Sequence, residues 1–261
     1  MKILKLAIAT GVVSLAGVAS ASAQTAVGLV GDKTLVMIDT AKPAVTKSIE
    51  VSGVDKLLGI DVRPSNKKIY GVTADGMLVT IDPATGAATK GAKLEKSIAA
   101  GTGAIVDFNP MADKLRFMST DGTNLRVDPD SGKVTTDGPL AFEKTDMHAG
   151  EKPNIVAAAY INAFGKPEKT AMYDIDATIG GLIQQVSPND GTLKAIGKLG
   201  TGAAKTFAFD VATSADGTNS AWLVADNMLY TVDLATGMAK SVGKVEGASA
   251  MIRDITALPK M

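Results

Sequence analysis

The sequence contains no cysteine, and it contains a single histidine (His148) and a single tryptophan among its 261 residues. Without cysteine the chain can form no disulfide scaffold, no thiolate zinc site, no iron–sulfur cluster and no cysteine nucleophile. One histidine cannot build a histidine-rich metal site within one chain. Aromatic residues make up only 4% of the chain, so few side chains are available as exposed stacking platforms.

An excess of charge of either sign is also lacking. The chain has 27 basic and 27 acidic residues, which gives a formal net charge of zero. A basic footprint for nucleic acid is therefore absent, and we expect no nucleic-acid partner. Charged residues make up 21% and hydrophobic residues 46% of the chain, a balance that predicts a folded protein with a packed core.

The first 23 residues have the pattern of a secretory signal peptide. Lys2 and Lys5 precede an apolar stretch, and Ala21-Ser22-Ala23 supplies the small residues that signal peptidase accepts. The apolar stretch is too short to favour a transmembrane helix, and no second long apolar run follows. We therefore expect a signal peptide over 1–23, a single domain over 24–261, a periplasmic or secreted location and no membrane insertion.

One unit with four β-like runs recurs along the chain. Its clearest copy comprises the runs Leu57–Val62, Lys68–Thr73, Met77–Asp82 and Ala87–Leu94. The turn-forming segments PSNK, ADG and PATG separate these runs. The same plan returns over residues 104–140, 155–199 and 207–245. A four-strand unit at this spacing is typical of a β-propeller blade.

The two ends of the mature chain complete a fifth unit. The N-terminal segment from Thr25 contains the second, third and fourth strands, and Met251–Leu258 matches the missing first strand. We predict an all-β fold, a five-bladed β-propeller of four-stranded blades, whose ring is closed by N- and C-terminal strands sharing one blade. A two-sheet sandwich or open barrel of about 20 strands is the alternative, but neither requires the same strand order five times.

Several runs carry a family resemblance. LLGIDVRP, IYGV, LVTIDPATGAAT, DFNP, NLRVDPDSG, NIVAAAYIN, SPNDGTL and DLATG resemble a bacterial domain-of-unknown-function family, numbered 4394. The similarity extends over essentially the whole mature chain and implies a secreted, propeller-like domain. It implies no reaction and no catalytic residues. The chain is similar in general style to propellers that bind pyrroloquinoline quinone or act as lactonases, but it does not match their characteristic features.

Four aspartates occupy corresponding places in the first strands of the units: Asp61, Asp107, Asp210 and Asp254, with Ala159 in the remaining unit. First strands are innermost in a propeller, so these carboxylates are expected to ring the channel and to have raised pKa values. They form a candidate metal site, and oxygen ligands suit a hard cation such as calcium. The alternative is that each carboxylate accepts backbone N–H groups between blades.

A different set of aspartates ends the third strands, at Asp39, Asp82, Asp128 and Asp233, each before a turn such as PATG. We expect these to have a structural role in the turns.

The longest irregular connection, Phe142–Asn154, joins the third and fourth blades. It is a candidate binding loop with five polar residues: Glu143, Asp146, His148, Glu151 and Asn154. His148 has acidic neighbours and could act as a general base, but a lone loop histidine is more often solvated without a catalytic role.

These observations favour a non-enzymatic module that binds a small ligand, an ion or a protein. A metal-dependent hydrolase or lactonase-like enzyme that uses the channel carboxylates is one alternative. A structural component of the envelope or matrix is the other. An enzyme would need an open metal position that faces a pocket, whereas a structural ion would be buried and fully ligated.

Overall fold

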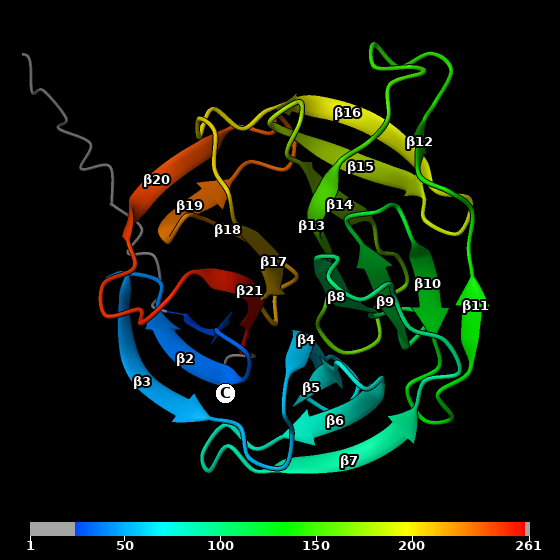
Figure 1. The fold of residues 1–261 in the computed structure, drawn as a ribbon. Helices are drawn as coiled ribbons and strands as arrows, with labels where there is room; N and C mark the ends of the chain where they lie inside the picture. The colour runs from blue at the N-terminus through cyan, green and yellow to red at the C-terminus, as the bar shows by residue number, and fades with distance from the viewer. Residues whose placement is uncertain (1–23, 259–261) are drawn as a thin grey trace, which may run out of the picture.

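The computed structural model describes residues 24–258 of the chain. These residues form 21 strands and no helix. The strands make five sheets arranged around one axis, so the five-bladed propeller is confirmed (Figure 1). The expected signal peptide, residues 1–23, lies outside the described residues. Within residues 24–258 there is no helix long and apolar enough to span a membrane.

We number the blades in chain order. The first blade has the strand order β21-β1-β2-β3 from the axis outward, and the second has the order β4-β5-β6-β7. Their bounds are β21 (Ile252–Ala257), β1 (Thr25–Val30), β2 (Thr34–Asp39), β3 (Ala44–Glu50), β4 (Leu57–Arg63), β5 (Lys68–Thr73), β6 (Met77–Ile81) and β7 (Ala88–Lys93).

The third blade has the order β8-β9-β10-β11, the fourth β13-β14-β15-β16 with β12 added at its outer edge, and the fifth β17-β18-β19-β20. Their bounds are β8 (Ala104–Asn109), β9 (Lys114–Ser119), β10 (Asn124–Val127), β11 (Val134–Thr136), β12 (Ala141–Phe142), β13 (Ile155–Tyr160), β14 (Met172–Asp176), β15 (Gly181–Ser187), β16 (Thr192–Lys198), β17 (Phe207–Thr213), β18 (Asn219–Ala225), β19 (Met228–Val232) and β20 (Ala239–Lys244).

Burial changes systematically from the axis to the rim. The innermost strand β4 (LLGIDVR) is buried along nearly its whole length, because the neighbouring blades cover both of its faces. The outermost strands β3, β7 and β20 are largely exposed and contain lysines. Charged residues on such outer strands discourage pairing with other chains.

The turns between third and fourth strands are built as the sequence predicts. Ala84 N–H donates to Asp82 Oδ1 over 2.8 Å, and Gly86 follows with a φ of 75°. Asp39, Asp128 and Asp233 accept the corresponding N–H bonds in their blades. Gly132 in the third blade also has a positive φ, 76°, and a Cβ at this position would overlap the carbonyl oxygen of Lys93. The structural role assigned to these turns is confirmed.

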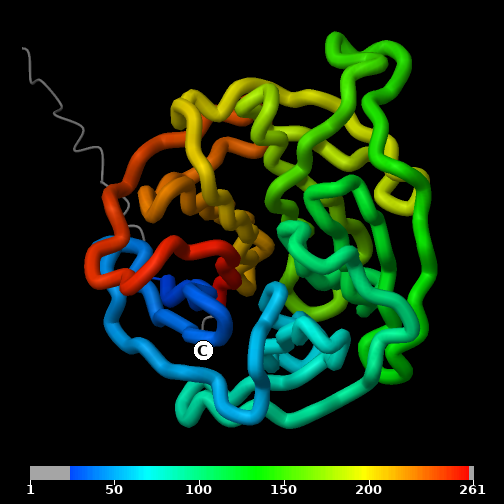
Figure 2. Tube along the Cα trace, viewed as in Figure 1, coloured from blue at the N-terminus to red at the C-terminus, as the bar shows by residue number. Residues whose placement is uncertain are grey.

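The ring closes through the pairing of β21 with β1. Ala26 pairs with Ala257 and Leu29 with Asp254 in an antiparallel ladder, and Leu258 N–H donates to Thr25 C=O over 2.9 Å. Figure 2 shows the blue and red ends of the chain lying beside each other in one blade. The prediction that both ends of the chain share one blade is confirmed.

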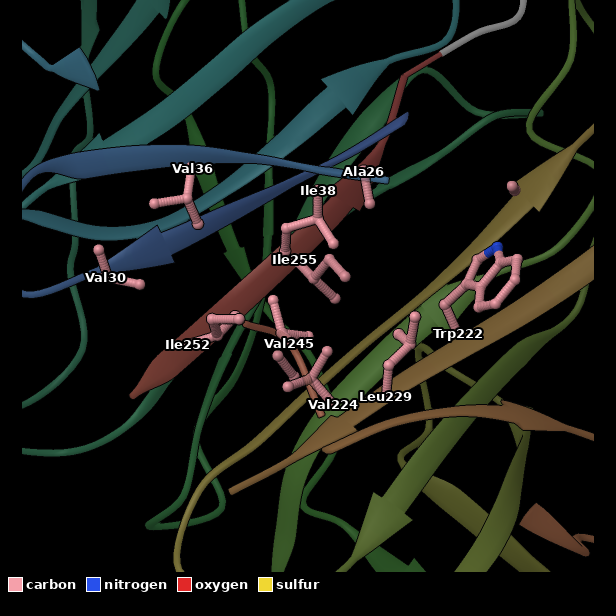
Figure 3. Close-up of a cluster of buried hydrophobic side chains, with 12 residues drawn as sticks. Ala26, Val30, Val36, Ile38, Trp222, Val224, Leu229, Val245, Ile252 and Ile255 are labelled. Carbon is pink, nitrogen blue, oxygen red and sulfur yellow. The ribbon is translucent and has the colours of Figure 1, made fainter. Parts of the chain in front are cut away.

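Hydrophobic cores fill the spaces between adjacent blades. Between the fifth and first blades, Ile252 and Ile255 of β21 and Ile38 of β2 pack with Val224 and Trp222 of β18 (Figure 3). Ile252 and Ile38 are completely buried. Because β21 supplies part of this core, the closing strand contributes packing as well as backbone hydrogen bonds.

Candidate functional site

The C-terminal halves of the innermost strands converge on a small cavity at one end of the axis. Asp61 of β4, Asp107 of β8 and Asp210 of β17 line this axial pocket. Each places a carboxylate oxygen within 4.8 Å of those of the other two. All three residues are buried, with 5–8% of their surface exposed. The structure therefore brings together three of the four aspartates that the sequence proposes as metal ligands.

Each of the three carboxylates also connects its blade to the next. Asp61 Oδ2 accepts a hydrogen bond from Phe108 N–H over 2.7 Å, and Asp107 Oδ1 accepts one from Tyr160 N–H over 2.9 Å. Asp210 Oδ2 accepts a hydrogen bond from Ala257 N–H over 2.6 Å. The aspartates thus have the inter-blade bonding role that the sequence left as the alternative. These bonds use oxygen lone pairs, but they do not neutralise the carboxylate charges.

Asp254 does not occupy the position equivalent to the other three, and the sequence alignment that placed it there was wrong by two residues. Thr256 occupies that position, because Val62 N–H donates to its Oγ1 over 3.2 Å, in the pattern of the other inter-blade bonds. Asp254 lies two residues before Thr256, on the same face of β21, and its two oxygens accept N–H bonds from Ile60 and Ile255.

The fourth blade has Ala159 at this position and makes no such bond. Val211 N–H, which a carboxylate from the fourth blade would bind, donates instead to Asp210 Oδ1 over 2.7 Å. The ring of inter-blade bonds is therefore interrupted beside Asp210.

Within the described residues no basic side chain hydrogen-bonds to the three carboxylates. Arg63 and Arg253 are neighbours of Asp61 and Asp254 in the sequence, but both bind elsewhere. Arg63 pairs with Asp113 at 2.6 Å and with Asp130 at 2.7 Å. The Arg253 guanidinium donates to backbone carbonyls, including that of Leu58. Lys67 lines the pocket, with its ammonium 5.9 Å from the centre of the Phe164 ring.

Burial is the main cause that shifts the carboxyl pKa values upward. Burial, together with the negative charge of Asp210, raises the pKa of Asp61 well above its usual value. Burial and the charges of Asp61 and Asp210 do the same for the pKa of Asp107. Burial raises the pKa of Asp210 to about 6 and that of Asp254 to about 7. Protons or a cation must therefore compensate this cluster.

Asp107 differs from the other two in its hydrogen bonding. Both oxygens of Asp61 and both oxygens of Asp210 accept hydrogen bonds. Asp107 uses only Oδ1, so its Oδ2 accepts no hydrogen bond from residues 24–258 while the side chain lines the pocket. The pocket has a volume of about 40 Å³, which is enough for an ion or a few water molecules.

The loop 142–154 begins in a short strand that pairs with the fourth blade, whereas the sequence suggests an irregular connection throughout. Phe142 belongs to β12, whose pairing with β16 leads into the loop, which projects beyond the ring in Figure 1. Asp146 fixes the loop by accepting N–H bonds from His148 and Ala195, both over 2.8 Å.

The remaining polar residues of this loop also make local contacts. The His148 ring lies 5.5 Å from that of Phe142, and its Nδ1 is 3.1 Å from Glu151 Oε2. Asn154 Nδ2 donates to Thr178 Oγ1 over 3.2 Å, and the backbone N–H of Glu143 donates to Leu193 C=O. That this loop binds a ligand stays a prediction.

The family-model comparison matches residues 34–256 to the family described as Domain of unknown function (DUF4394). The chain belongs to this family. No curated protein matches the sequence significantly. The family resemblance that the sequence motifs indicate is therefore confirmed, and we refer to residues 34–256 as the DUF4394 domain.

One solved structure from Bacteroides shares the fold at low sequence identity. The DUF4394 domain is similar to a protein of unknown function from Bacteroides thetaiotaomicron, with 17% identity and a TM-score of 0.55, over 91% of this chain and 65% of that chain. It is also similar to a structure titled an auxiliary nutrient binding protein from Bacteroides ovatus, with 14% identity and a TM-score of 0.48, over 84% of this chain and 58% of that one. The chain thus spans less than two thirds of either protein.

Nothing in the sequence indicated a buried carboxyl that lies away from the axial pocket of the DUF4394 domain. Asp174 of β14 is completely buried, and neither of its oxygens has a hydrogen-bond partner in the described part of the chain. Burial raises its pKa well above the usual value, while the charge of Arg116 acts in the opposite direction. Asp174 pairs across the sheet with Ala158 and Ile183, and the sequence MYDID gives no sign that a charged residue faces the core. The role of Thr256 was missed because the segment IRDI (252–255) resembles GIDV (59–62) more closely than it resembles LLGI (57–60), the segment to which it corresponds in the structure.

Proposed function

We propose that this DUF4394 domain is an exported, non-enzymatic binding module that holds a hard cation such as calcium in the axial pocket. The observation that carries the proposal is the convergence of three buried carboxylates that have no basic hydrogen-bond partner among residues 24–258, and one of which has an oxygen that accepts no hydrogen bond from these residues. The signal-peptide pattern of residues 1–23 supports export.

The donor set favours a hard cation. Asp61, Asp107 and Asp210 offer carboxylate oxygens, and the hydroxyl of Thr256 lies beside them, 2.8 Å from Asp61 Oδ1. Calcium binds oxygen at about 2.3–2.6 Å, so two oxygens on opposite sides of one ion lie about 4.6–5.2 Å apart. The separation of at most 4.8 Å between the three carboxylate oxygens is compatible with one shared ion.

The size of the pocket favours binding of an ion over catalysis. Its volume of about 40 Å³ is well below the roughly 300–1,000 Å³ of sites that accept small-molecule substrates. A metal-dependent hydrolase needs space for substrate beside the metal, and this cavity offers little. The residues that line it include no histidine or serine that could serve as a base or nucleophile.

Thermal unfolding of chelator-treated protein at pH 7.5, with and without added Ca²⁺ or Tb³⁺, tests the proposal. A cation that binds only the folded state stabilises it by about 2.7 kcal/mol at a hundredfold excess over its dissociation constant. We expect a higher melting temperature with either ion, and saturable binding in a calorimetric titration.

Asp107→Asn is the variant best suited to this test. Its Oδ1 can still accept the hydrogen bond from Tyr160, and its amide group replaces only the oxygen that accepts no bond. The variant should fold and lose the response to cations. Asp254→Asn is the matched control, because Asp254 has a raised pKa but lies outside the cluster of three. It should keep the response. A wild-type melting temperature that neither ion changes, or an Asp107→Asn protein that responds like wild type, contradicts the proposal.

A further inference from the structure

The opposite end of the axis has a larger cavity, which we call the basic mouth. It has a volume of about 550 Å³ and opens between the N-terminal ends of the innermost strands and the adjoining loops. Its apolar lining comes from four innermost strands and consists of Leu58, Ala104, Val156 and Phe207. A volume of this size falls within the range of small-molecule sites.

The charged side chains around the basic mouth are mostly positive. Lys56, Lys205 and Arg253 line it, against a single acidic residue, Asp32. Asp32 is already paired with Lys56, at 3.2 Å. The ammonium of Lys205 makes no hydrogen bond or ion pair with any residue between 24 and 258. Asp226 accepts the backbone N–H groups of Thr206 and Lys205, which lower its pKa, and the nearby charge of Lys205 acts in the same direction.

Arg253 is held in place without a carboxylate bound to it. Its Nε donates to Gly31 C=O over 2.7 Å, and one of its terminal nitrogens donates to Leu58 C=O over 2.7 Å. The other terminal nitrogen donates to the carbonyls of Asp32 and Leu57. Carbonyl oxygens fix the orientation of the guanidinium without binding a carboxylate to it, although the charges of Asp254 and Asp32 act on it from nearby.

The loop 100–104 leaves room for a ligand close to its backbone. Gly101 has a φ of 83°, and a Cβ added there would meet no atom within 4 Å. The loop position is fixed at Gly103, whose N–H donates to Thr120 Oγ1 over 3.0 Å. A ligand in the mouth can therefore approach the glycine backbone without displacing a side chain.

The basic mouth combines an apolar lining with positively charged side chains around it, and this combination suits a ligand that has both an apolar body and a negative charge. An inorganic anion would leave the floor unoccupied, and a neutral apolar molecule would not use the positive charges. We propose that the basic mouth binds an organic carboxylate with an apolar body, such as an aryl or alkyl carboxylic acid. Its carboxylate contacts Lys205 beside Arg253, and its apolar body covers Val156 and Phe207.

This site is separate from the axial pocket. Leu58 at the basic mouth and Asp61 at the axial pocket are three residues apart on β4, or about 10 Å. Gly59 lies between them, and a Cβ there would overlap the side chains of Val106 and Asp254, which shows that the channel is filled at this level. Binding of the anion and binding of the cation can therefore succeed or fail independently.

Amide chemical shifts in a titration with 2-naphthoate test the proposal. We expect saturable shifts centred on Gly101, Gly103 and Phe207. The neutral analogue 2-naphthylmethanol and the carboxylate acetate, which lacks an apolar body, should each bind at least tenfold more weakly. Lys205→Gln should raise the Kd for 2-naphthoate at least fivefold, and Lys240→Gln on the exposed outer strand β20 should leave it unchanged.

Three results would overturn the proposal. They are the absence of saturable shifts at the basic mouth, equal binding of 2-naphthoate and 2-naphthylmethanol, and an unchanged Kd in Lys205→Gln. Folding of each variant is checked by the dispersion of its amide spectrum, so a loss of binding through unfolding is recognised directly.

Discussion

In the absence of cations, the protein should become more stable as the pH falls from 7.5 to 5. Burial raises the pKa of Asp210 from 3.8 to about 6 and that of Asp254 to about 7. A carboxyl with a raised pKa binds more protons in the folded than in the unfolded chain, so the free energy of unfolding falls as pH rises through this window. The usual carboxylate, with a lowered pKa, behaves in the opposite way.

The size of the effect follows from the same values. With each pKa unit equal to about 1.4 kcal/mol, ionisation of Asp210 in the folded state costs about 3 kcal/mol at pH 7.5. At pH 5 the carboxyl is mostly protonated in the folded state and mostly ionised in the unfolded state, and the cost is about half as large. Asp210 should therefore contribute about 1 kcal/mol, and Asp254 about 2 kcal/mol, to the gain between pH 7.5 and pH 5. Carboxylates with lowered pKa values, such as Asp113 and Asp128, keep their contributions across this range.

Urea unfolding monitored by the fluorescence of Trp222, the single tryptophan, provides the assay, because its side chain is buried between the fifth and first blades. Chelator-treated protein is compared at pH 5, 6, 7 and 7.5. Saturating Ca²⁺ should weaken or reverse the trend, because the ion binds the ionised carboxylates of Asp61, Asp107 and Asp210 most tightly at the higher pH. Asp107→Asn should be more stable than wild type at pH 7.5 and show a weaker pH dependence. A cation-free protein whose stability rises steadily from pH 5 to 7.5 would refute the reasoning about the axial carboxylates.

Four further outcomes are expected. Deleting residues 251–261 removes β21, and should abolish cooperative urea unfolding; a truncated protein with a wild-type transition would contradict the ring closure. Asp174→Asn removes a buried ionisable group whose burial raises its pKa and which has no hydrogen-bond partner in residues 24–258, so the free energy of unfolding should rise by about 1–3 kcal/mol at pH 7.5 and change little at pH 4, with a uniform gain at both pH values counting against this explanation. Gly132→Ala should lower the melting temperature strongly, because φ is positive and the new methyl group meets Lys93, whereas Gly101→Ala, also at positive φ but in open space, should lower it less. Intact mass of protein from the periplasmic fraction should correspond to a chain that begins at Gln24, and an intact Met1 on membrane-bound protein would show that the leader is retained.

The sequence was sufficient to predict the blades because local chemistry defines them. Turn segments such as ADG and PATG separate runs of five to seven β-forming residues, and the turn aspartates and glycines act within a few residues of each other. The closing pair β1 and β21 was predictable as well, since the other blades show which strand the N-terminal segment lacks.

The site was less predictable because it depends on register between blades. Matching IRDI with GIDV aligns two aspartates, but the buried isoleucines, Ile255 and Ile60, align one residue before Thr256 and Asp61. The burial of Asp174 and the separation of basic residues from the axial carboxylates depend on packing between blades, which no single strand encodes. The side chains around the basic mouth come from innermost strands and loops of several blades, and their proximity is visible only once the ring is formed.

Thr25 and Leu258 lie next to each other, so the packing of the blades does not require the chain to begin and end in the first blade. Their backbones are joined by one hydrogen bond of 2.9 Å, so a short linker could connect them and new termini could be opened in a loop between two other blades. In such a circular permutant every blade would be made of consecutive strands. The pairing of β1 with β21 would then join neighbouring segments of the sequence instead of its two ends. Because long-range pairing slows folding, the permutant should reach the native state faster than the natural connectivity, with the same final architecture.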